Sequence, residues 1–440
     1  MSTIREAPEP KISPYLQFLY GLFNFLLLGV MIFSFLSVGG FTKFPGVHIS
    51  NTVDSPLAQP ELHKVPQGLT PGGARDQGKT WHTPDRFPQC SMDVCFNYSR
   101  CDDMEELLVY QYDMENSPSW FFKDAWKRSR YYTIDPEKAC VFLVTVDMRL
   151  ENGPLLKSLP HWNNGLNHIV VSIADTWVST QASAGSNSID MASTMTSITH
   201  QSTYRAGFDI SVPVPQRKFY PSLQRLKALD KKYFLTFKGT RYLQDPGVGG
   251  FRSNPILRKM HNGDDIIVAT TCKQAKLNGV SLRQPEVEAE CEKDQLIYNE
   301  FKFDDLMNST FGLIPAGRGP SSFRLLEVLS AGTIPVVISD NFVLPFDSLI
   351  EWRRCLFVFP TSQMQRIVPT LRSLNRKEIE LRREYCLFIY RKFFVDDDKI
   401  VETTAMALEA RFFGVIPKLI PKVPLPPRHL NLEQPLPKSL

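Results

Sequence analysis

The sequence predicts an α/β protein built on parallel sheets, and three observations lead to this class. Short runs rich in Val, Ile, Leu and Phe recur through the central part of the chain, and helical patterns lie between many of them. Such alternation is typical of strand–helix–strand units with parallel pairing. Residues 313–339 contain a whole unit, with an apolar strand, a glycine-rich loop, a helical pattern and a β-branched strand. The central part spans about 320 residues, a length that favours two domains.

The N-terminal region predicts a membrane anchor at residues 15–38. This stretch is dominated by Leu, Phe, Val and Ile, and no charged residue lies between Lys11 and Lys43. A spanning helix needs roughly 20 apolar residues, and the short apolar core and cleavage site of a signal peptide are not evident. Arg5 and Lys11 lie on the N-terminal side, so the distribution of positive charge favours a cytosolic tail of residues 1–14 and a lumenal body.

Two segments rich in proline border the central body. Residues 39–89 contain many Pro, Gly and polar residues without a sustained period, which is typical of a flexible stem. Residues 414–440 are rich in proline as well, which excludes a helix or an interior strand. The folded part of the chain is therefore expected between residues 90 and 413.

Short apolar runs predict strands at residues 141–146, 168–173, 208–212, 234–237, 266–270, 311–314, 334–339 and 356–359. Helical patterns are expected at residues 296–307, 367–374, 378–394 and 399–413. Asp396, Asp397 and Asp398 precede the last helix, and we interpret them as favouring its N-terminus rather than binding a metal. Residues 176–205 are rich in Ser and Thr and have no clear period, so they predict a long loop, either a lid or a disordered insert.

The eight cysteines indicate an oxidising compartment. They lack the paired Cys-x-x-Cys spacing of zinc sites, so disulfides are the better interpretation. Other connectivities remain open on sequence alone, and the expected pairs are Cys90–Cys95, Cys101–Cys140 and Cys272–Cys291. Cys355 begins a strand-like run and Cys386 lies in a helical one, so both are expected to be buried thiols.

Surface charge and glycosylation signals agree with a lumenal body. The formal net charge is only +4, and no nucleic-acid-binding motif is present. Basic residues gather at two places, Lys127 with Arg128 and Arg130, and Lys231 with Lys232. We interpret both clusters as solvated helix faces, with binding to an acidic polysaccharide as the alternative. The sequons that begin at Asn97 and Asn308 predict N-glycosylation.

The unit at residues 313–339 predicts an anion-binding loop. Ser321 or Ser322 can cap its helix, and Gly332 is placed to end it. Arg324 in the first turn opposes the helix dipole, and Glu327 follows one turn later; each effect costs about 0.3–1 kcal/mol. A bound anion at this helix N-terminus would turn the cost into a gain. An exposed Arg–Glu pair on a surface helix is the alternative.

The loop itself excludes two common phosphate-binding motifs. Gly317-Arg318-Gly319 is followed by no Gly-Lys-Ser/Thr, as a P-loop requires, and it lacks the third glycine of a dinucleotide fingerprint. A diphosphate held by arginines, with a carboxylate one turn further on for a ribose diol, fits a sugar nucleotide instead.

Five blocks of the sequence carry a resemblance to a known family. They are WNNGLNH at residues 162–168, FDISVP at 208–213, FKGTRY at 237–242, NSTFGLIPAGRGPSSFRLLEVLSAGTIPVVIS at 308–339 and LPF at 344–346. In composition and order they resemble the exostosin family, glycosyltransferase family 47, over about residues 90–412. The FKG-x-R-Y block and the early cysteines resemble the heparan sulfate co-polymerase branch more than the plant members.

The resemblance implies a GT-B glycosyltransferase with two Rossmann-like domains, an acceptor domain at residues 90–230 and a nucleotide-sugar domain at 231–413. It implies a single-pass type II membrane protein of the Golgi or endoplasmic reticulum. It also implies inverting transfer of glucuronic acid from UDP-glucuronate to a heparan sulfate precursor ending in N-acetylglucosamine, without a catalytic metal.

The chain departs from the family pattern in ways that bear on partners and activity. Members of this branch carry a C-terminal family 64 domain, which is not expected in this chain, so a larger exostosin-like partner is expected. Gly312 and Thr333 replace a cysteine pair of relatives, and Ala316 replaces a basic residue. Two alternatives therefore stay open: a catalytically weak assembly subunit that stabilises a bifunctional polymerase, and transfer of another sugar, as in plant relatives.

The resemblance and the chemistry of the loop together predict the donor site. Arg318 and Arg324 are expected to bind the diphosphate and to neutralise charge on the UDP leaving group. Ser322 and the amides around Ser321 and Phe323 are expected to add hydrogen bonds at the helix N-terminus.

Three further residues complete the predicted site. Glu327 is expected to bind the ribose hydroxyls, and Arg241 a phosphate or the carboxylate of the donor. His168 is expected to face the cleft, where it would orient the acceptor or act as a base. A histidine that caps the core is the alternative for His168, and the sequence identifies no other general base.

Overall fold

The structure is a computed structural model that describes residues 90–101, 104, 106–113, 123–146, 153–172, 189–242, 250–273, 276–277, 280–281, 285–317, 319–413 and 425–427. The predicted anchor, the stem, nearly all of the C-terminal Pro-rich segment and Arg318 lie outside these residues. A search of the described ranges finds no helix with the length and apolar character needed to span a bilayer.

The first sheet is parallel and contains six strands in the order β2-β1-β3-β4-β5-β6. These strands are β1 (Val109–Gln111), β2 (Tyr132–Thr133), β3 (Val141–Thr145), β4 (His168–Ser172), β5 (Ser193–Thr196) and β6 (Ile210–Ser211). The central strand β3 is buried along its whole length, as expected for a parallel sheet covered on both faces. The short helices of this half are α2 (Lys123–Arg128) and α3 (Gly153–Lys157).

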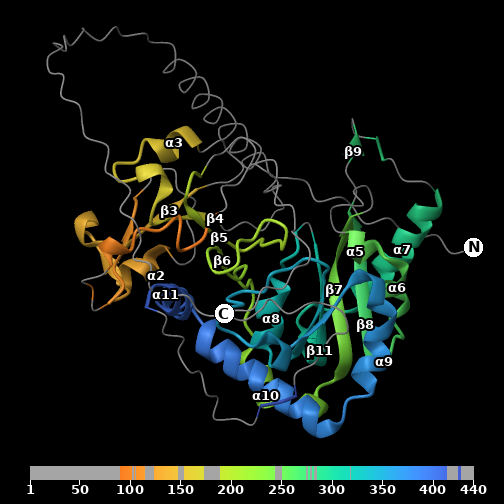
Figure 1. The fold of residues 1–440 in the computed structure, drawn as a ribbon. Helices are drawn as coiled ribbons and strands as arrows, with labels where there is room; N and C mark the ends of the chain where they lie inside the picture. The colour runs from red at the N-terminus through yellow and green to blue at the C-terminus, as the bar shows by residue number, and fades with distance from the viewer. Residues whose placement is uncertain are drawn as a thin grey trace, which may run out of the picture. The chain divides into compact units, whose positions relative to one another are not determined.

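The second sheet is also parallel and has five strands in the order β13-β12-β11-β7-β8 (Figure 1). They are β7 (Tyr233–Tyr242), β8 (Ile266–Lys273), β11 (Ser309–Pro315), β12 (Ile334–Ile338) and β13 (Phe357–Phe359). A two-stranded antiparallel ribbon, β9 (Lys276–Leu277) with β10 (Val280–Ser281), follows β8. The helices in this half of the chain are α5 (Gly250–Ser253), α6 (Pro255–Lys259), α7 (Pro285–Glu300), α8 (Arg324–Ser330), α9 (Ile367–Arg372), α10 (Arg376–Phe393) and α11 (Asp397–Phe413).

The main apolar core of the second half lies between its sheet and α8 and α10, which lie side by side in Figure 1. Phe311 of β11, Phe357 of β13 and Phe393 of α10 are almost fully buried in it. Burying an aromatic or aliphatic side chain contributes about 1.5–3 kcal/mol. This core therefore holds the glycine-rich loop and α8 on a rigid base.

The α/β class with two Rossmann-like parallel sheets is confirmed. Strand β5 lies inside the stretch 176–205, which was expected to be a loop, so that prediction is wrong for Ser193–Thr196. Three of its four residues are polar, and the buried Ser193 donates its Oγ–H to the Phe208 carbonyl at 2.5 Å, which satisfies the hydroxyl inside the fold. The sequence shows no apolar run at this strand, because a hydrogen bond satisfies a buried hydroxyl where other buried strands carry apolar side chains.

The three expected disulfides are confirmed, Cys90–Cys95, Cys101–Cys140 and Cys272–Cys291. The prediction of two free buried thiols is wrong, because Cys355 and Cys386 form a fourth disulfide with their Cα atoms 4.9 Å apart. This bond joins the segment before β13 to α10. Nothing local in the sequence shows that these two elements are neighbours, and burial alone cannot distinguish a thiol from a half-cystine.

Two local predictions at helix ends are confirmed. Gly332 follows α8 with φ of +64°, in the left-handed region where glycine is favoured. Asp396 precedes α11, and its carboxylate accepts the Lys399 N–H at 2.8 Å, as a capping residue does. No group of three or more His, Cys, Asp or Glu side chains suited to a metal ion occurs within the described ranges.

The FDISVP block joins the two halves of the fold. The Asp209 carboxylate accepts the Thr194 N–H at 2.8 Å and the guanidinium of Arg205 at 2.7 and 2.9 Å. Arg411 of α11 donates to the carbonyls of Phe208 and Asp209 at 2.7 and 2.6 Å. The last helix therefore binds the edge of the first sheet, although it was assigned to the second domain; the boundary between residues 230 and 231 stays a prediction.

Candidate functional site

Strands β7 and β11 lie side by side in the second sheet, and the chain leaves them in opposite directions, to β8 and to β12 (Figure 1). In open parallel sheets, ligands bind at the carboxyl ends of two such strands. The two strands pair only as far as Thr236 and Gly312. Beyond that point β7 continues beside β8 to Tyr242 and β11 beside β12 to Pro315, so the two strands no longer bond to each other.

Arg324, the first residue of α8, reaches this point from the glycine-rich loop. Its side chain is only 9% exposed, and Nη2 donates to the Lys238 carbonyl of β7 at 2.6 Å. The guanidinium lies 4.0 Å from the centroid of the Phe303 ring. Nε and Nη1 have no hydrogen-bond partner among the described residues. Buried donors without partners cost free energy, and an anion between them would recover it.

The charges of Arg324 and Glu327 are set by burial. Burial lowers the pKa of Arg324 to about 10, and the Glu327 carboxylate opposes this shift, so the guanidinium stays charged at neutral pH. Burial raises the pKa of Glu327, whereas Arg324 and the Arg217 N–H lower it. The Arg324 Nε and Glu327 Oε2 atoms are 3.7 Å apart. The exposed Arg–Glu pair that was the alternative is therefore wrong, since both side chains are buried.

The loop before α8 contributes polar groups in a different way from the one predicted. Phe323 occupies the N-cap position, without a side-chain capping bond, and its ring lies 3.9 Å from the Arg217 guanidinium. The Ser322 hydroxyl accepts the Arg324 N–H at 3.3 Å, and Ser321 lies half-buried beside it. Ser322 therefore lies one residue before the N-cap position, and its hydroxyl still accepts an N–H of the first turn.

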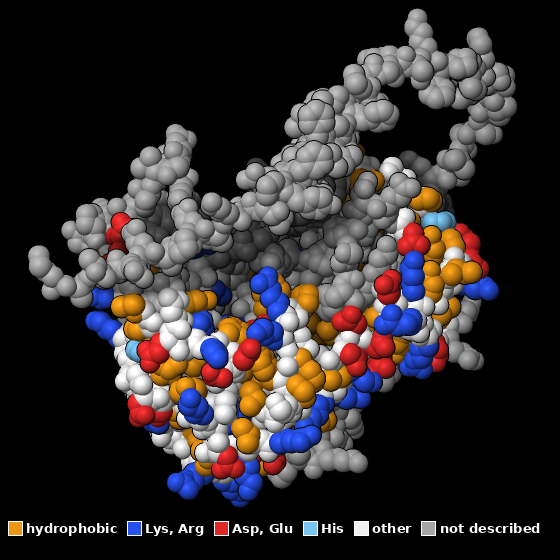
Figure 2. Space-filling model, turned by 180° about the vertical axis from the view of Figure 1, so that it is seen from behind, with side chains coloured by type: hydrophobic (Ala, Val, Ile, Leu, Met, Phe, Trp, Pro, Cys, Tyr) orange, Lys and Arg blue, Asp and Glu red, His pale blue; other side chains and the backbone are white. Residues whose placement is uncertain are grey.

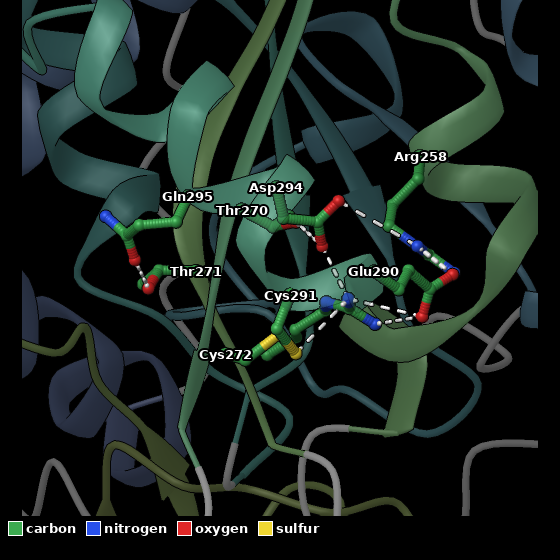
Figure 3. Close-up of a disulfide and its surroundings, with 9 residues drawn as sticks. Arg258, Thr270, Thr271, Cys272, Glu290, Cys291, Asp294 and Gln295 are labelled. Atoms are coloured by element: carbon green, nitrogen blue, oxygen red, sulfur yellow. Dashed lines mark hydrogen bonds and ion pairs between the residues drawn. A yellow bond between two sulfur atoms is a disulfide. The ribbon is translucent and has the colours of Figure 1, made fainter. Parts of the chain in front are cut away.

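Arg241 does not join Arg324 but pairs with Glu290 and Asp294. Figure 3 shows these two carboxylates and Arg258 beside the Cys272–Cys291 disulfide. The Arg241 guanidinium lies 2.5 Å from the Asp294 carboxylate and 3.4 Å from that of Glu290. Arg258 pairs with the same two carboxylates. Two cations and two anions compensate one another, and Arg241 is 2% exposed. In the structure Arg241 is thus held in ion pairs, and its contact with the donor stays a prediction.

His168 does not face a cleft, and this correction follows from its place in β4. It is the first residue of that strand, at the amino edge of the sheet, opposite to the edge where ligands bind. Nδ1–H donates to the Leu166 carbonyl at 2.7 Å, and Nε2 accepts from the Tyr112 hydroxyl at 3.1 Å. Burial lowers the pKa of His168 to about 4, and its ring stacks on Phe142. The alternative of a core histidine therefore describes it.

The first of the two basic clusters is engaged in ion pairs. Lys127, Arg128 and Arg130 pair with Asp113, Asp398 and Glu106 respectively. Acidic and basic side chains are also mixed over the coloured part of the face in Figure 2. The interpretation as solvated surfaces holds for these three residues. It is wrong for Lys231, which is 7% exposed and donates to the Ala331 carbonyl.

Three glycines report close approaches that sequence patterns did not reveal. A Cβ atom on Gly239 would lie 2.6 Å from the Phe237 ring, which explains the phenylalanine and glycine of the FKGTRY block. A Cβ on Gly317 would lie 2.8 Å from Nη2 of Arg252, a residue that sequence reasoning missed. A Cβ on Gly319 would lie 2.9 Å from Ile198, in the loop after β5 of the other sheet. In each case a large side chain of another residue lies against the glycine Cα, so the glycine itself is the sequence signal of the contact.

Comparison with known proteins places these features in a family context. The family model described as the Exostosin GT47 domain matches residues 82–374. The chain is 31% identical over 417 residues to Exostosin-1 of Drosophila melanogaster, covering 87% of this chain and 52% of that protein. Exostosin-1c of Danio rerio is 30% identical over 377 residues, covering 79% of this chain and 50% of that protein. The chain spans about half the length of the curated relatives it matches.

Two solved structures are similar at low sequence identity. WaaG, a glycosyltransferase involved in lipopolysaccharide biosynthesis, has a TM-score of 0.33 and 12% identity, with 68% of this chain and 98% of WaaG covered. AviGT4, a glycosyltransferase involved in avilamycin A biosynthesis, has a TM-score of 0.32 and 14% identity, with 70% and 99% covered.

Proposed function

The chain belongs to the exostosin family, glycosyltransferase family 47, and from this premise we propose that it transfers glucuronic acid from UDP-glucuronate to a chain ending in N-acetylglucosamine. The observation that carries the proposal is Arg324, a buried cation with unused donors where β7 and β11 part. An inverting transfer releases UDP, whose diphosphate gains negative charge in the transition state. Preorganised cations at that point stabilise the transition state more than the ground state.

We assign the remaining roles from the geometry around Arg324. Nε and Nη1 of Arg324 bind the diphosphate, and the loop at Ser321 and Ser322 adds hydrogen bonds to it. The Glu327 carboxylate, held beside the guanidinium at 3.7 Å, is placed for the ribose hydroxyls. Arg318 lies outside the described residues, and its position in the same loop supports it as a further phosphate ligand. Guanidinium groups would neutralise the leaving group without a metal.

We also propose where and with what the chain acts. The four disulfides fit an oxidising lumen, and the predicted anchor at residues 15–38 fits a single-pass type II protein of the Golgi or endoplasmic reticulum. The resemblance to the heparan sulfate branch supports a larger exostosin-like partner in a hetero-oligomer. In this proposal residues 90–230 bind the acceptor and residues 231–413 the donor.

A second function, that of an assembly subunit with weak activity, is favoured by one observation. Ala316 lies between β11 and the glycine loop and is 2% exposed, so this position places an apolar methyl group where relatives carry a basic residue. Less positive charge near the diphosphate would weaken donor binding. The chain would then stabilise a bifunctional polymerase rather than supply the glucuronic acid itself.

Replacement of Arg324 separates the two functions. The full-length chain is produced alone and with a larger exostosin-like chain, and UDP-glucuronate transfer to an acceptor ending in N-acetylglucosamine is measured. Arg324→Gln is expected to lower kcat by about 100- to 1,000-fold, the effect of removing one donor from a charge-stabilising site. Arg128→Gln, which alters an exposed arginine paired with Asp398, serves as the control and should retain activity.

Each other outcome has a defined meaning. Undiminished transfer by the Arg324→Gln complex would identify the chain as an assembly subunit. Transfer from another UDP-sugar, with no use of UDP-glucuronate, would contradict the donor assignment. Thermal melting of the variant is needed beside these assays, because Arg324 is buried.

A further inference from the structure

The first sheet has a strand order with a switch point of its own. The chain leaves β1 for β2 on one side and leaves β3 for β4 on the other, so the neighbours β1 and β3 have connections that run in opposite directions. In sheets with this strand order, ligands bind at the carboxyl ends of the first and third strands. The carboxyl end of β1 is Gln111, and that of β3 is Thr145.

Gln111 is a buried polar residue that the fold leaves incompletely paired. It is 4% exposed, and its side-chain oxygen Oε1 has no hydrogen-bond partner among the described residues. Burying an amide oxygen without a hydrogen bond costs free energy. An apolar residue such as Val109, two positions earlier on the same face of β1, would fill the position without this cost. A glutamine at this strand end is therefore suited to a partner that comes from outside the chain.

We propose that Gln111 lies in an acceptor subsite, where its side-chain amide binds the acetamido group of an N-acetylglucosamine unit inside the acceptor chain. This inference rests on the proposed function and deepens it. It locates a part of the acceptor site and names the chemical group that this part recognises.

The chemistry of the amide selects this group. Oε1 is an acceptor, so its ligand must bring a donor, which the ionised carboxylate of glucuronic acid lacks. An acetamido group has an N–H and a carbonyl, so it can donate to Oε1 and accept from Nε2 in a two-point pair. The charged side chains of Asp113 and Lys127, which follow Gln111 along the chain, pair with each other at 2.8 Å. This pairing agrees with a neutral ligand group at the strand end.

The place of Gln111 along the sheet fits an inner sugar of the chain. Ile198, just after β5, lies against Gly319 of the loop proposed to bind the donor. Strands β1 and β5 are three strand spacings apart, which is about 14 Å. A chain that ends at the donor loop and follows the carboxyl edge of the sheet passes Gln111 with a sugar behind its terminal one. In the proposed acceptor N-acetylglucosamine alternates with glucuronic acid, so the third sugar from the end carries the next acetamido group.

Binding of two tetrasaccharides to the full-length chain, in the presence of UDP, tests the proposal. Both alternate N-acetylglucosamine with glucuronic acid and end in N-acetylglucosamine, and in the second a hydroxyl replaces the inner acetamido group. The wild type should bind the first about 10- to 100-fold more tightly, as expected for two hydrogen bonds. Gln111→Leu should bind the first as weakly as the second, and its affinity for UDP should equal that of the wild type.

Thermal melting separates this role from a structural one. Because Gln111→Leu removes an unsatisfied buried amide, its melting temperature should equal that of the wild type or exceed it. A glutamine that supports the fold would give a lower value. Gln365→Leu makes the same change at an exposed glutamine of the second half, and as the control it should keep the wild-type preference between the tetrasaccharides. If Gln111→Leu does not fold, Gln111→Met provides the comparison.

Several results would overturn the proposal. Equal binding of both tetrasaccharides by the wild type contradicts it, and so does a preference that survives in Gln111→Leu or a lower melting temperature of this variant. A wild type that binds UDP but does not distinguish the tetrasaccharides would leave the proposed function standing and end this inference alone. A wild type that binds neither UDP nor a tetrasaccharide would contradict both.

Discussion

At the scale of single residues, the partners of a charged side chain decide its role more than its type does. Arg241 and Arg324 are both buried arginines within the second half of the fold. Arg241 lies between two carboxylates, whereas Arg324 has one carboxylate at 3.7 Å and two donors without hydrogen-bond partners among the described residues. A buried cation that is fully paired stabilises structure, and one that is incompletely paired is available to a ligand.

Lys231 gives a pH-dependent contribution to stability. Burial and then Arg383 lower the pKa of its amine to about 7, and Glu380 opposes the shift. The unfolded chain holds this proton up to a pH near 10.4. Between pH 7 and about 10 the unfolded state therefore binds more protons, and stability should rise with pH. Urea denaturation at pH 7 and pH 9 should show this rise in the wild type and a smaller one in Lys231→Met.

Lys232→Met is the control for this measurement, because the neighbouring Lys232 is exposed. It should keep the slope of the wild type. Equal slopes for Lys231→Met and the wild type would contradict the assignment of the proton to Lys231.

At the scale of elements, the sequence predicts strands and helices that have a local pattern of apolar residues. It misses elements that depend on contacts with residues far along the chain. The strands at residues 334–339 and 141–146 were predicted because nearly every residue is apolar, as a central parallel strand requires. Strand β5 was missed because the buried hydroxyl of Ser193 depends on a partner 15 residues away, Phe208. The same limit applies to the site: the sequence indicated Arg324 through its helix, but Arg252 meets the loop only after the sheet has formed.

The disulfide between Cys355 and Cys386 ties together two elements that are distant in the sequence. It closes a loop with a sequence separation of 31, against 5 for Cys90–Cys95. A longer closed loop restricts the unfolded chain more, so Cys355→Ala with Cys386→Ala should lower the free energy of unfolding by about 2–4 kcal/mol. The matched change at Cys90 and Cys95 should cost less. Denaturant titration of both double variants measures the difference, and a larger loss for the short loop would contradict the argument.

At the scale of the whole molecule, the two sheets are joined by buried polar contacts around Asp209. The carboxylate organises Arg205 and the start of β5, while Arg411 of the last helix holds the neighbouring carbonyls. The Phe346 N–H also donates to the Ser211 carbonyl at 2.8 Å, which connects the LPF block to β6. The blocks of family resemblance thus include the residues that fix one half of the fold to the other.

Asp209→Asn tests this junction. It removes the charge opposite a buried guanidinium, and breaking a buried pair in this way costs about 3–5 kcal/mol. Asp398→Asn, which breaks the exposed pair of α11 with Arg128 of α2, should cost less than about 1 kcal/mol. Thermal unfolding of both variants measures the contrast, and equal melting temperatures would contradict a structural role for Asp209.

The contact between Gly319 and Ile198 bears on how the proposed donor and the proposed acceptor would influence each other. The glycine belongs to the loop proposed to bind the donor, and the isoleucine follows β5 in the other sheet. A donor that shifts this loop would therefore displace Ile198, and an acceptor that moves Ile198 would displace the loop. Because such coupling is reciprocal, the factor by which UDP-sugar changes acceptor affinity equals the factor by which acceptor changes UDP-sugar affinity. In the proposed function, this contact would link the two binding equilibria.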